Sequence, residues 1–508
     1  METDRRIRRI AIVGGGLAGW LAAISLTRKL AGQVTIHVID SPDTGTAGLA
    51  EATIPHMLEL LRFLGVDQND FIDKTQSTYS LGAKLSDWPG VGQSFWRPFG
   101  GFGALIERRP FYHFWHKAKA AGLQPKIEMF SHEISMAQAN RFIFPTNSLG
   151  VAQNLRYAIH FDTALATRYL RTMAERSGVI RLEKKLAGAT RRDDGFLDEL
   201  EFEDGGKLRA DLYIDNTGAR GQLIGEMLGV PYESWQQWLP ADRILSAPAP
   251  LEDARPPYLR ITARDAGWAW RAPLQQSLSV GYVYSSAHES DESALAALRA
   301  SAGADLATEP RRVAATAGRR RSFWEKNVVA LGAASGFLEP LVGVDTHLLT
   351  NTLFNLLDHF PDRQFDPANI ASYNASIGAE LERVRDYLIL HYQLSTREEP
   401  FWMAARAAAP PEALAQRLAL YRGTGRIMVG RDDLFTDLDW FWLFEGLGVT
   451  PQDYDPLVDT LDFEQVKRAM LAISQKIMTD VAAAPSHDSF FAAANARLVG
   501  ARKLAAAQ

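Results

Sequence analysis

The first forty residues show an apolar strand, a glycine turn, an apolar helix and a second strand in succession. Residues 10–13 form a short apolar run, residues 14–19 contain the glycine turn, and residues 20–28 continue as a largely apolar helix. A second apolar run over residues 34–40 ends in Asp40. This order predicts a parallel β-α-β unit whose glycine turn lies at the carboxyl end of the first strand.

The glycine turn has the spacing of a dinucleotide-binding site. Gly14 permits the tight turn, Gly16 lets a pyrophosphate approach the backbone, and Gly19 lets the helix pack on the strand. Asp40 follows Gly19 by 21 residues, close to the spacing expected of an acid that binds the adenosine ribose. An ordinary tight turn is the alternative. We expect a dinucleotide to contact Gly14, Gly16, Ala18, Gly19 and Asp40.

Two strands much further along the chain also enter turns of small residues. Residues 211–215 lead into Asn216, Thr217 and Gly218, and residues 327–331 lead into Gly332. Flavoprotein monooxygenases return to the dinucleotide through late strands of this kind. The order therefore favours FAD over a nicotinamide cofactor.

The remaining pattern divides the chain into interleaved segments. Aromatic residues are concentrated in residues 89–153, and the pattern beyond residue 369 is helical almost to the end. We predict an α/β fold (α+β overall) with a Rossmann-like FAD-binding module over residues 1–368. Substrate-site segments at about 89–153 and 222–325 are interleaved in this module, and a mainly helical module over residues 369–508 packs on it.

Composition narrows the classes of function. The chain has 508 residues, of which 46% are apolar and 23% charged, and a net charge of -5, so it predicts a globular protein with no basic excess for nucleic acid. The absence of cysteine excludes disulfides and thiolate chemistry and fits the cytoplasm. We find neither an apolar run long enough to span a membrane nor a metal-binding motif.

Several motifs, in order along most of the chain, resemble those of the flavin-dependent tryptophan halogenases. The specific one is Trp268-Ala-Trp270-Arg-Ala-Pro273, which is similar to the family's Trp-x-Trp-x-Ile-Pro. Ala50-Glu51-Ala-Thr-Ile-Pro resembles the family's Gly-Glu-Ala-Thr-Ile-Pro. The others are Trp20 after the glycine turn, His160-Phe-Asp162, Asp215-Asn-Thr-Gly218, Phe337-Leu-Glu-Pro-Leu341, His391-Tyr392, Pro400-Phe-Trp402 and Gly446-Leu-Gly448.

The resemblance implies a particular chemistry. In this family a separate flavin reductase supplies reduced FAD, which reacts with O2 to a flavin hydroperoxide, and halide then yields hypohalous acid that travels through a tunnel to an aromatic substrate. A lysine ammonium holds that acid and a glutamate assists attack. The resemblance also places Ala50, Glu51, Gly332 and Leu341 at the cofactor, and Trp268, Trp270 and Pro273 near the flavin.

The lysine position is occupied by a small residue. Aligning residues 79–88 on the family's Phe-Lys-x-x-Ile-x-Phe-x-x-Trp, with Trp88 as the anchor, places Ser80 at the lysine position. Lys84 shares a strand face with Ser80 but lies about 13 Å further along the strand. We interpret Lys84 as a solvated strand residue; a shifted alignment would make it the alternative catalytic lysine.

The loop after Leu341 departs from the family as well. The family continues with Glu-Ser-Thr-Gly, in which the glutamate is catalytic and the following amides hold chloride, whereas this chain continues with Val342-Gly-Val-Asp345. Val342 therefore stands at the glutamate position, and the Asp345 carboxylate would repel a halide. Glu339 matches a structural position and is not given the role. Halide use is left open.

Substrate candidates come from the aromatic segments. His113 lies in the segment 89–153, and Trp440 and Trp442 lie in a compact stretch before the Gly446 turn, although core packing is an equal alternative for them. We find no clamp for the charged ends of free tryptophan. The sequence favours a plain aromatic, an indole derivative or a larger molecule.

Three functions remain open. The first is a halogenase-family enzyme that uses reduced FAD and O2 to halogenate or oxygenate an aromatic substrate, with halogenation in doubt because of Ser80 and Val342. The second is a flavin oxidase or dehydrogenase on the same scaffold. The third is a catalytically silent flavin-binding protein. The oligomeric state is left open.

Overall fold

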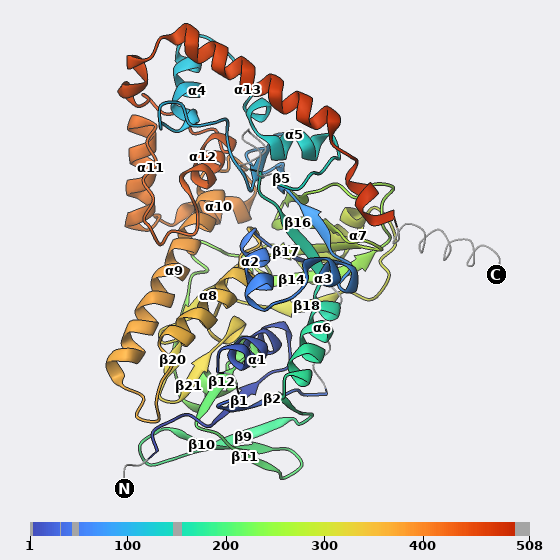
Figure 1. The fold of residues 1–508 in the computed structure, drawn as a ribbon, viewed down its shortest axis with the longest axis vertical. Coiled ribbons are helices and arrows are strands. Elements are labelled where there is room, and N and C mark those ends of the chain that lie inside the picture. The colour runs from blue at the N-terminus through green and yellow to red at the C-terminus, as the bar shows by residue number, and fades with distance from the viewer. Residues whose placement is uncertain (1–3, 31, 43–49, 146–154, 493–508) are drawn as a thin grey trace, which may run out of the picture. The chain divides into compact units, whose positions relative to one another are not determined.

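The computed structural model describes residues 4–30, 32–42, 50–145 and 155–492 (Figure 1). Contacts group the chain into two compact units, each made of three chain segments. Unit 1 comprises Met1–Thr75, Phe161–Arg243 and Val313–Glu382, and unit 2 comprises Gln76–His160, Ile244–Arg312 and Arg383–Gln508. The predicted module boundary at 368/369 falls inside α9 (Pro367–Gln393).

Unit 1 is built on a six-stranded sheet in the order β20-β21-β12-β1-β2-β8. The pairs β8-β2-β1-β12-β21 are parallel, and β20 is antiparallel to β21. The predicted β-α-β unit is confirmed, since a glycine turn connects the first strand to α1 and α1 contacts both strands (Figure 1). The elements are β1 (Arg9–Val13), α1 (Leu17–Leu30), β2 (Thr35–Ile39), β8 (Ile180–Leu182), β12 (Leu212–Asp215), β20 (Trp324–Glu325) and β21 (Val328–Ala330).

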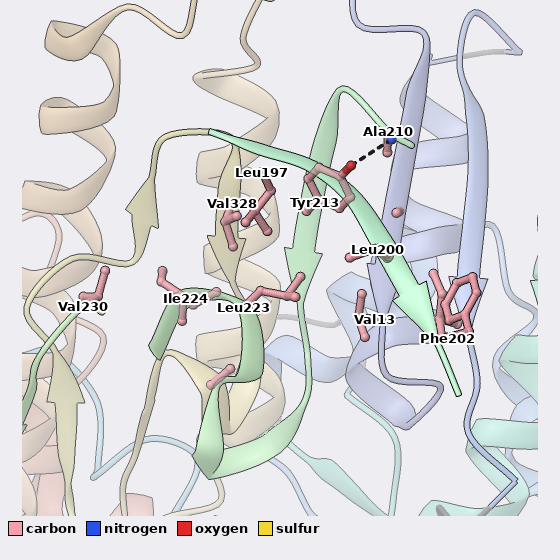
Figure 2. Close-up of a cluster of buried hydrophobic side chains, with 14 residues drawn as sticks. Val13, Leu197, Leu200, Phe202, Ala210, Tyr213, Leu223, Ile224, Val230 and Val328 are labelled. Carbon is pink, nitrogen blue, oxygen red and sulfur yellow. Dashed lines mark hydrogen bonds between the residues drawn. The ribbon is translucent and has the colours of Figure 1, made fainter. Parts of the chain in front are cut away.

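A small antiparallel sheet and several helices complete unit 1. Glu203-Asp-Gly-Gly206, a sequence typical of a hairpin turn, joins β10 to β11. Figure 2 shows how apolar side chains of β10 and its neighbours pack with β12 and β21. In this cluster the Tyr213 hydroxyl accepts a hydrogen bond from Ala210 N at 3.0 Å and donates one to Asp198 O at 2.6 Å. The elements are β3 (Ala50–Ala52), α2 (His56–Phe63), α3 (Gln68–Lys74), α6 (Thr163–Arg176), β9 (Leu186–Arg191), β10 (Leu197–Phe202), β11 (Lys207–Arg209), β13 (Tyr232–Ser234), β19 (Gly318–Arg320), β22 (Gly336–Phe337) and α8 (Asp345–Asp358).

Unit 2 contains a seven-stranded sheet in the order β18-β14-β17-β16-β15-β5-β6. Strand β15 alternates strictly between buried and half-buried residues, as expected of a sheet with one face on a core. At the β14–β17 end the other face packs against α7. The elements are β4 (Thr78–Ser80), β5 (Gly82–Ser86), β6 (Ser94–Pro98), β7 (Ala158–Asp162), β14 (Arg243–Ala249), β15 (Leu259–Arg264), β16 (Gly267–Pro273), β17 (Leu278–Tyr284), α7 (Asp291–Ala302) and β18 (Arg311–Ala314).

Helices form the rest of unit 2. From residue 369 to residue 492 the described chain is helical or irregular, in agreement with the predicted helical pattern. Residues 146–153 of the predicted aromatic segment and 493–508 of the predicted helical module lie outside the described residues. None of the described helices is both long and apolar enough to cross a membrane. The helices are α4 (Phe111–Ala120), α5 (His132–Gln138), α10 (Pro400–Ala407), α11 (Glu412–Thr424), α12 (Asp437–Gly446) and α13 (Phe463–Ala483).

Candidate functional site

A cavity of about 600 Å³ opens at the glycine turn of unit 1. Its wall includes Gly14, Gly16 and Ala18 from the turn and Asn216 from the end of β12. The two sides are joined by a hydrogen bond, because Asn216 Nδ2 donates to Gly14 O at 3.0 Å. Ligand pockets are commonly about 300–1,000 Å³ in volume, so the cavity has the size of a cofactor site.

Gly14, Gly16 and Gly19 of the glycine turn have different surroundings. A Cβ added at Gly14 would lie 2.1 Å from Asn216 O, and one at Gly19 would lie 2.0 Å from Gly14 O. These two positions therefore need glycine for backbone packing. A Cβ at Gly16 would meet only Asn216 Nδ2, at 3.9 Å, and Gly16 lines the cavity. Gly16 leaves open the space in which a pyrophosphate would lie.

Asp40 stands directly after β2 and is 8% exposed. Its Oδ2 accepts a hydrogen bond from Arg181 Nε at 2.7 Å. Its Oδ1 would lie 2.1 Å from a Cβ at Gly15, so the carboxylate presses against the glycine turn. The flanking residues Ile39 and Ser41 line the cavity. Arg181 is thus a partner of Asp40 that the sequence pattern did not indicate.

The late turn of unit 1 approaches the same cavity. Gly332 has a φ of 57°, and a Cβ there would lie 3.2 Å from Asn216 Oδ1 and 3.6 Å from the Cβ of Ala18. Further along, Leu341 and Val342 are 0% and 3% exposed. Val342, which the sequence predicts to stand at the family's glutamate position, is therefore an apolar core residue.

The loop after Val342 rests on strand β3. A Cβ at Gly343 would lie 2.7 Å from Ala52 O, so this loop and β3 are in backbone contact. The contact brings together two carboxyl groups, Glu51 on β3 and Asp345 at the first residue of α8. Burial, together with repulsion by Asp345, whose own side chain is exposed, raises the pKa of Glu51 to about 8. Thr346 Oγ1 donates to Glu51 Oε1 at 3.2 Å.

Asp345 also faces a second cavity in unit 1, of about 190 Å³. Glu380 lies on the same wall, where its Oε1 is 2.9 Å from His347 Nε2 and Asn351 Nδ2 donates to its Oε2. The loop that holds halide in the family is thus bordered here by carboxyl groups. The pairing of Asp345 with Glu51 could not be read from the sequence, because the two lie almost 300 residues apart.

Ser80 and Lys84 lie on consecutive strands of unit 2. Ser80, at the end of β4, is 1% exposed, and its Oγ donates to Gly82 O at 3.2 Å. Lys84 lies on β5, where it is paired laterally with Arg260 of β15. Arg260 in turn is paired with Arg271 of β16.

The register separates Lys84 from the tryptophan motif. Laterally paired residues project from one face of a sheet, and consecutive residues of a strand alternate between faces. Lys84 and Arg271 therefore share a face, whereas Trp268 and Trp270 project from the opposite face. Lys84 Nζ lies 5.7 Å from the centre of the Trp96 ring.

The tryptophan motif belongs to an aromatic cluster of unit 2. Trp268 is 1% exposed, and its ring centre lies 6.3 Å from that of Trp88 and 5.9 Å from that of Trp270. Trp270 covers Gly281, where an added Cβ would lie 1.9 Å from the indole. Pro273 O accepts a hydrogen bond from Thr78 Oγ1 at 2.6 Å, which ties the end of β16 to β4.

The three substrate candidates lie on two neighbouring helices. Trp440 and Trp442 of α12 are 3% and 2% exposed, and no hydrogen-bond partner for either Nε1 occurs among the described residues. His113 of α4 is buried, which lowers its pKa to about 4, and its Nδ1 accepts from Asp455 N at 3.4 Å. The rings of Tyr112 and Phe441 stack at 5.2 Å and join α4 to α12.

A buried arginine on the same sheet face as the tryptophan motif was missed. Arg97 of β6 is 6% exposed, and its Nη1 lies 3.5 Å from His391 Nε2. His391 Nδ1 lies 2.9 Å from Tyr387 O, so Nδ1 is the donor and neutral Nε2 faces the guanidinium. Burial lowers the pKa of both groups, that of His391 to about 3. The sequence signal was a single cation inside the aromatic stretch Phe95–Phe99.

Comparisons with known proteins agree along most of the chain. The family described as tryptophan halogenase matches residues 9–463. A tryptophan 6-halogenase of Streptomyces toxytricini is 30% identical over 439 residues, 82% of this chain and 84% of that protein. A tryptophan 7-halogenase of Lentzea aerocolonigenes is 28% identical over 489 residues, 89% of this chain and 91% of that protein.

Solved structures show the same relationship. BrvH, a flavin-dependent halogenase from Brevundimonas sp. BAL3, superimposes with a TM-score of 0.92 at 35% identity and covers 97% of this chain and 100% of its own. A flavin-dependent halogenase from Xanthomonas campestris gives the same score and identity over 96% and 98% of the two chains. The chain therefore belongs to the tryptophan halogenase family, whose members are enzymes that use reduced FAD from a separate flavin reductase.

Proposed function

We propose that this protein uses reduced FAD and O2 to transform an aromatic substrate that is indole-like or larger, and that selective halogenation is weak in it. The proposal rests on family membership and on one observation in particular. The side chains at the family's lysine and glutamate positions, Ser80 and Val342, are small, neutral and buried.

FAD fits the larger cavity of unit 1. Gly14, Gly16, Ala18 and Gly19 would hold its pyrophosphate, and Asp40 would bind the ribose through Oδ1, the oxygen that does not accept from Arg181 Nε. Ala50, Glu51, Gly332 and Leu341 are proposed at the rest of the cofactor. When bound in reduced form, FAD supplies the reaction with O2.

The residue at the lysine position cannot perform the lysine's role. An ammonium offers three donors and a positive charge, whereas the Ser80 hydroxyl has one donor, directed at Gly82 O. Val342 has no group that can accept charge or a proton. Positioned electrostatic and acid-base groups commonly contribute about a hundredfold to ten-thousandfold in rate, so their replacement weakens halogenation strongly.

The loop at the halide position is also unfavourable to an anion. Glu51 and Asp345 repel each other when both are charged, and burial favours the neutral form of Glu51. Any charge that remains on Asp345 repels chloride or bromide. Two protonatable carboxyls could instead deliver a proton to a reacting oxygen, which favours oxygen insertion over halogenation.

Substrate recognition is proposed for the aromatic part of unit 2. Trp268, Trp270 and Pro273 would shield the flavin, and His113, Trp440 and Trp442 are the candidates for contact with an arene. Arg97 is added as a buried cation held by neutral His391. A second function, flavin oxidase activity without substrate transformation, is favoured by the same replacement of the lysine and glutamate by Ser80 and Val342.

Product analysis tests the proposal. The purified protein is supplied with a flavin reductase, NADH, FAD, O2, bromide and a panel of arenes, and products are identified by mass spectrometry. We expect an oxygenated product, or slow and unselective bromination of the most electron-rich arenes. Rapid bromination of free tryptophan at a single position would contradict the proposal, and peroxide release without any product would favour the oxidase.

A further inference from the structure

Three cations stand in one row across adjacent strands of unit 2. Lys84 of β5 pairs with Arg260 of β15, and Arg260 pairs with Arg271 of β16. Arg264 follows Arg260 by four residues on β15, so both side chains project from the same face of the sheet. Like charges directly opposite one another destabilise a sheet. We call Lys84, Arg260, Arg264 and Arg271 the cationic row.

The protein neutralises little of this charge. Glu252 accepts hydrogen bonds from both Arg260 and Arg271, and among the described residues it is the only carboxylate in an ion pair with the row. Arg264 donates instead to Ser301 Oγ at 3.0 Å, and Arg271 also donates to Ser301 O at 2.8 Å. Four cations therefore face one anion, although the whole chain has a net charge of -5.

The guanidinium groups are partly desolvated. The Arg260 and Arg271 side chains are 28% and 24% exposed. The Nε atoms of Arg260, Arg264 and Arg271 are shielded from solvent and have no hydrogen-bond partner among the described residues. Burial, followed by repulsion from Arg260, lowers the pKa of Arg271. An anion placed over the row would relieve both the repulsion and the desolvation.

Two aromatic residues flank the Lys84 end of the row. Trp96 of β6 is paired laterally with Lys84, and its ring meets that of Tyr258 edge-to-face at 4.8 Å. Neighbouring strands are about 4.8 Å apart, so three paired residues span about 10 Å. Carboxylates at positions i, i+3 and i+7 of an α-helix span a similar distance, since each residue rises about 1.5 Å.

We propose that the cationic row, with Trp96 and Tyr258, docks an acidic helix of a partner protein. The helix would lie across β5, β15 and β16 and present carboxylates at helical spacing, with an apolar side chain beside the half-buried Tyr258, since the neighbouring Trp96 is only 8% exposed. The spacing favours a helix over a single phosphate, whose oxygens cannot reach three strands. The row lies on the face of the sheet that α7 covers at β16 and β17, so the partner helix would lie beside α7, over the half-exposed ends of the cations. The inference holds whichever reaction the enzyme performs.

A fluorescence anisotropy titration tests the proposal on the full-length protein. The probe is a labelled alanine-rich helical peptide with Glu at i, i+3 and i+7 and one terminal Leu. We expect binding that weakens with salt and falls at least about tenfold in the double variant Lys84→Gln, Arg260→Gln. Glu252→Gln should tighten binding, because it removes the one anion of the row.

Opposite effects of these variants separate docking from damage to the fold, which cannot improve affinity. Arg299→Gln, an exposed change on α7 outside the row, and a peptide with Gln in place of Glu are the matched controls. Equal affinity for the parent and the double variant would overturn the proposal, as would no binding. Displacement of the peptide by pyrophosphate at lower concentration than by unlabelled peptide would also overturn it, in favour of a small phosphate ligand.

Discussion

Lys84 and Trp270 project from opposite faces of the seven-stranded sheet of unit 2. Lys84 pairs with Arg260, which pairs with Arg271, so the three side chains share a face. Trp270 directly precedes Arg271 on β16 and therefore projects from the opposite face. A strand residue cannot change face without shifting the register by one residue, which would move every apolar side chain of β5 out of the core. Lys84 thus lies away from the proposed flavin shield.

Gly16→Val should abolish FAD uptake while the apoprotein remains folded. A Cβ at Gly16 meets no protein atom closer than 3.9 Å, so the valine would occupy the space of the cofactor. We expect affinity to fall by at least about a hundredfold, measured by FAD titration, with an unchanged Tm of the apoprotein. Gly423→Val, in open space on α11, is the control. Normal FAD binding by Gly16→Val would remove the cavity as the cofactor site.

Trp270→Ala should raise peroxide release per reduced FAD consumed. The indole covers Gly281, and its loss would open this face of the sheet to water. The measurement compares peroxide yield and bound-flavin fluorescence in the parent, Trp270→Ala and Trp270→Phe. The phenylalanine variant should retain most of the shielding. If the alanine variant matches the parent in both measurements, the tryptophan does not shield the flavin.

Asp345→Asn should stabilise the protein increasingly as pH rises. Burial and repulsion by Asp345 raise the pKa of Glu51 to about 8 in the folded state, so the folded protein holds this proton to higher pH than the unfolded chain. Stability is therefore lost as pH rises from the ordinary carboxyl range through the raised pKa of Glu51, and the loss is smaller once the repulsion by Asp345 is removed. We expect the Tm difference between variant and parent to be small at acidic pH and positive at pH above neutral.

The exposed Asp358→Asn at the other end of α8 is the control for Asp345→Asn. The same variant should bind bromide more tightly, which can be followed as quenching of flavin fluorescence. A Tm difference independent of pH would show that the two carboxyls are not coupled to folding.

Ser80→Lys combined with Val342→Glu should increase selective halogenation. The pair restores the cation and the carboxylate that the family uses, and each such group commonly contributes about a hundredfold or more. The gain is measured as the rate and positional selectivity of arene bromination. Each single variant should gain less than the pair, because the two groups act on one reaction.

Lys84→Ala is the matched test of the alignment. Because Lys84 lies on the face of the sheet opposite Trp268 and Trp270, we expect its removal to leave the bromination rate within about twofold of the parent, a change smaller than any loss of a positioned catalytic group. Efficient selective halogenation by the parent that disappears in Lys84→Ala would show that the alignment is shifted and that Lys84 is the lysine.

Features that depend on local chain geometry could be predicted from the amino-acid sequence. The glycine turn between β1 and α1 could be predicted because its spacing and periodicity lie within forty residues, and the hairpin at residues 203–206 for the same reason. The family could be recognised because its motifs are contiguous segments, above all the one that contains Trp268 and Trp270.

Contacts between side chains far apart in the chain depend on the three-dimensional fold and could not be predicted. The carboxyl pair Glu51–Asp345 and the hydrogen bond from Arg181 to Asp40 join residues far apart in the chain, and no local pattern reports such neighbours. The face of Lys84 depends on strand register, which is set by core packing and not by β5 alone. For this reason the sequence could only predict that Ser80 and Val342 depart from the family, and the structure was needed to show what surrounds them.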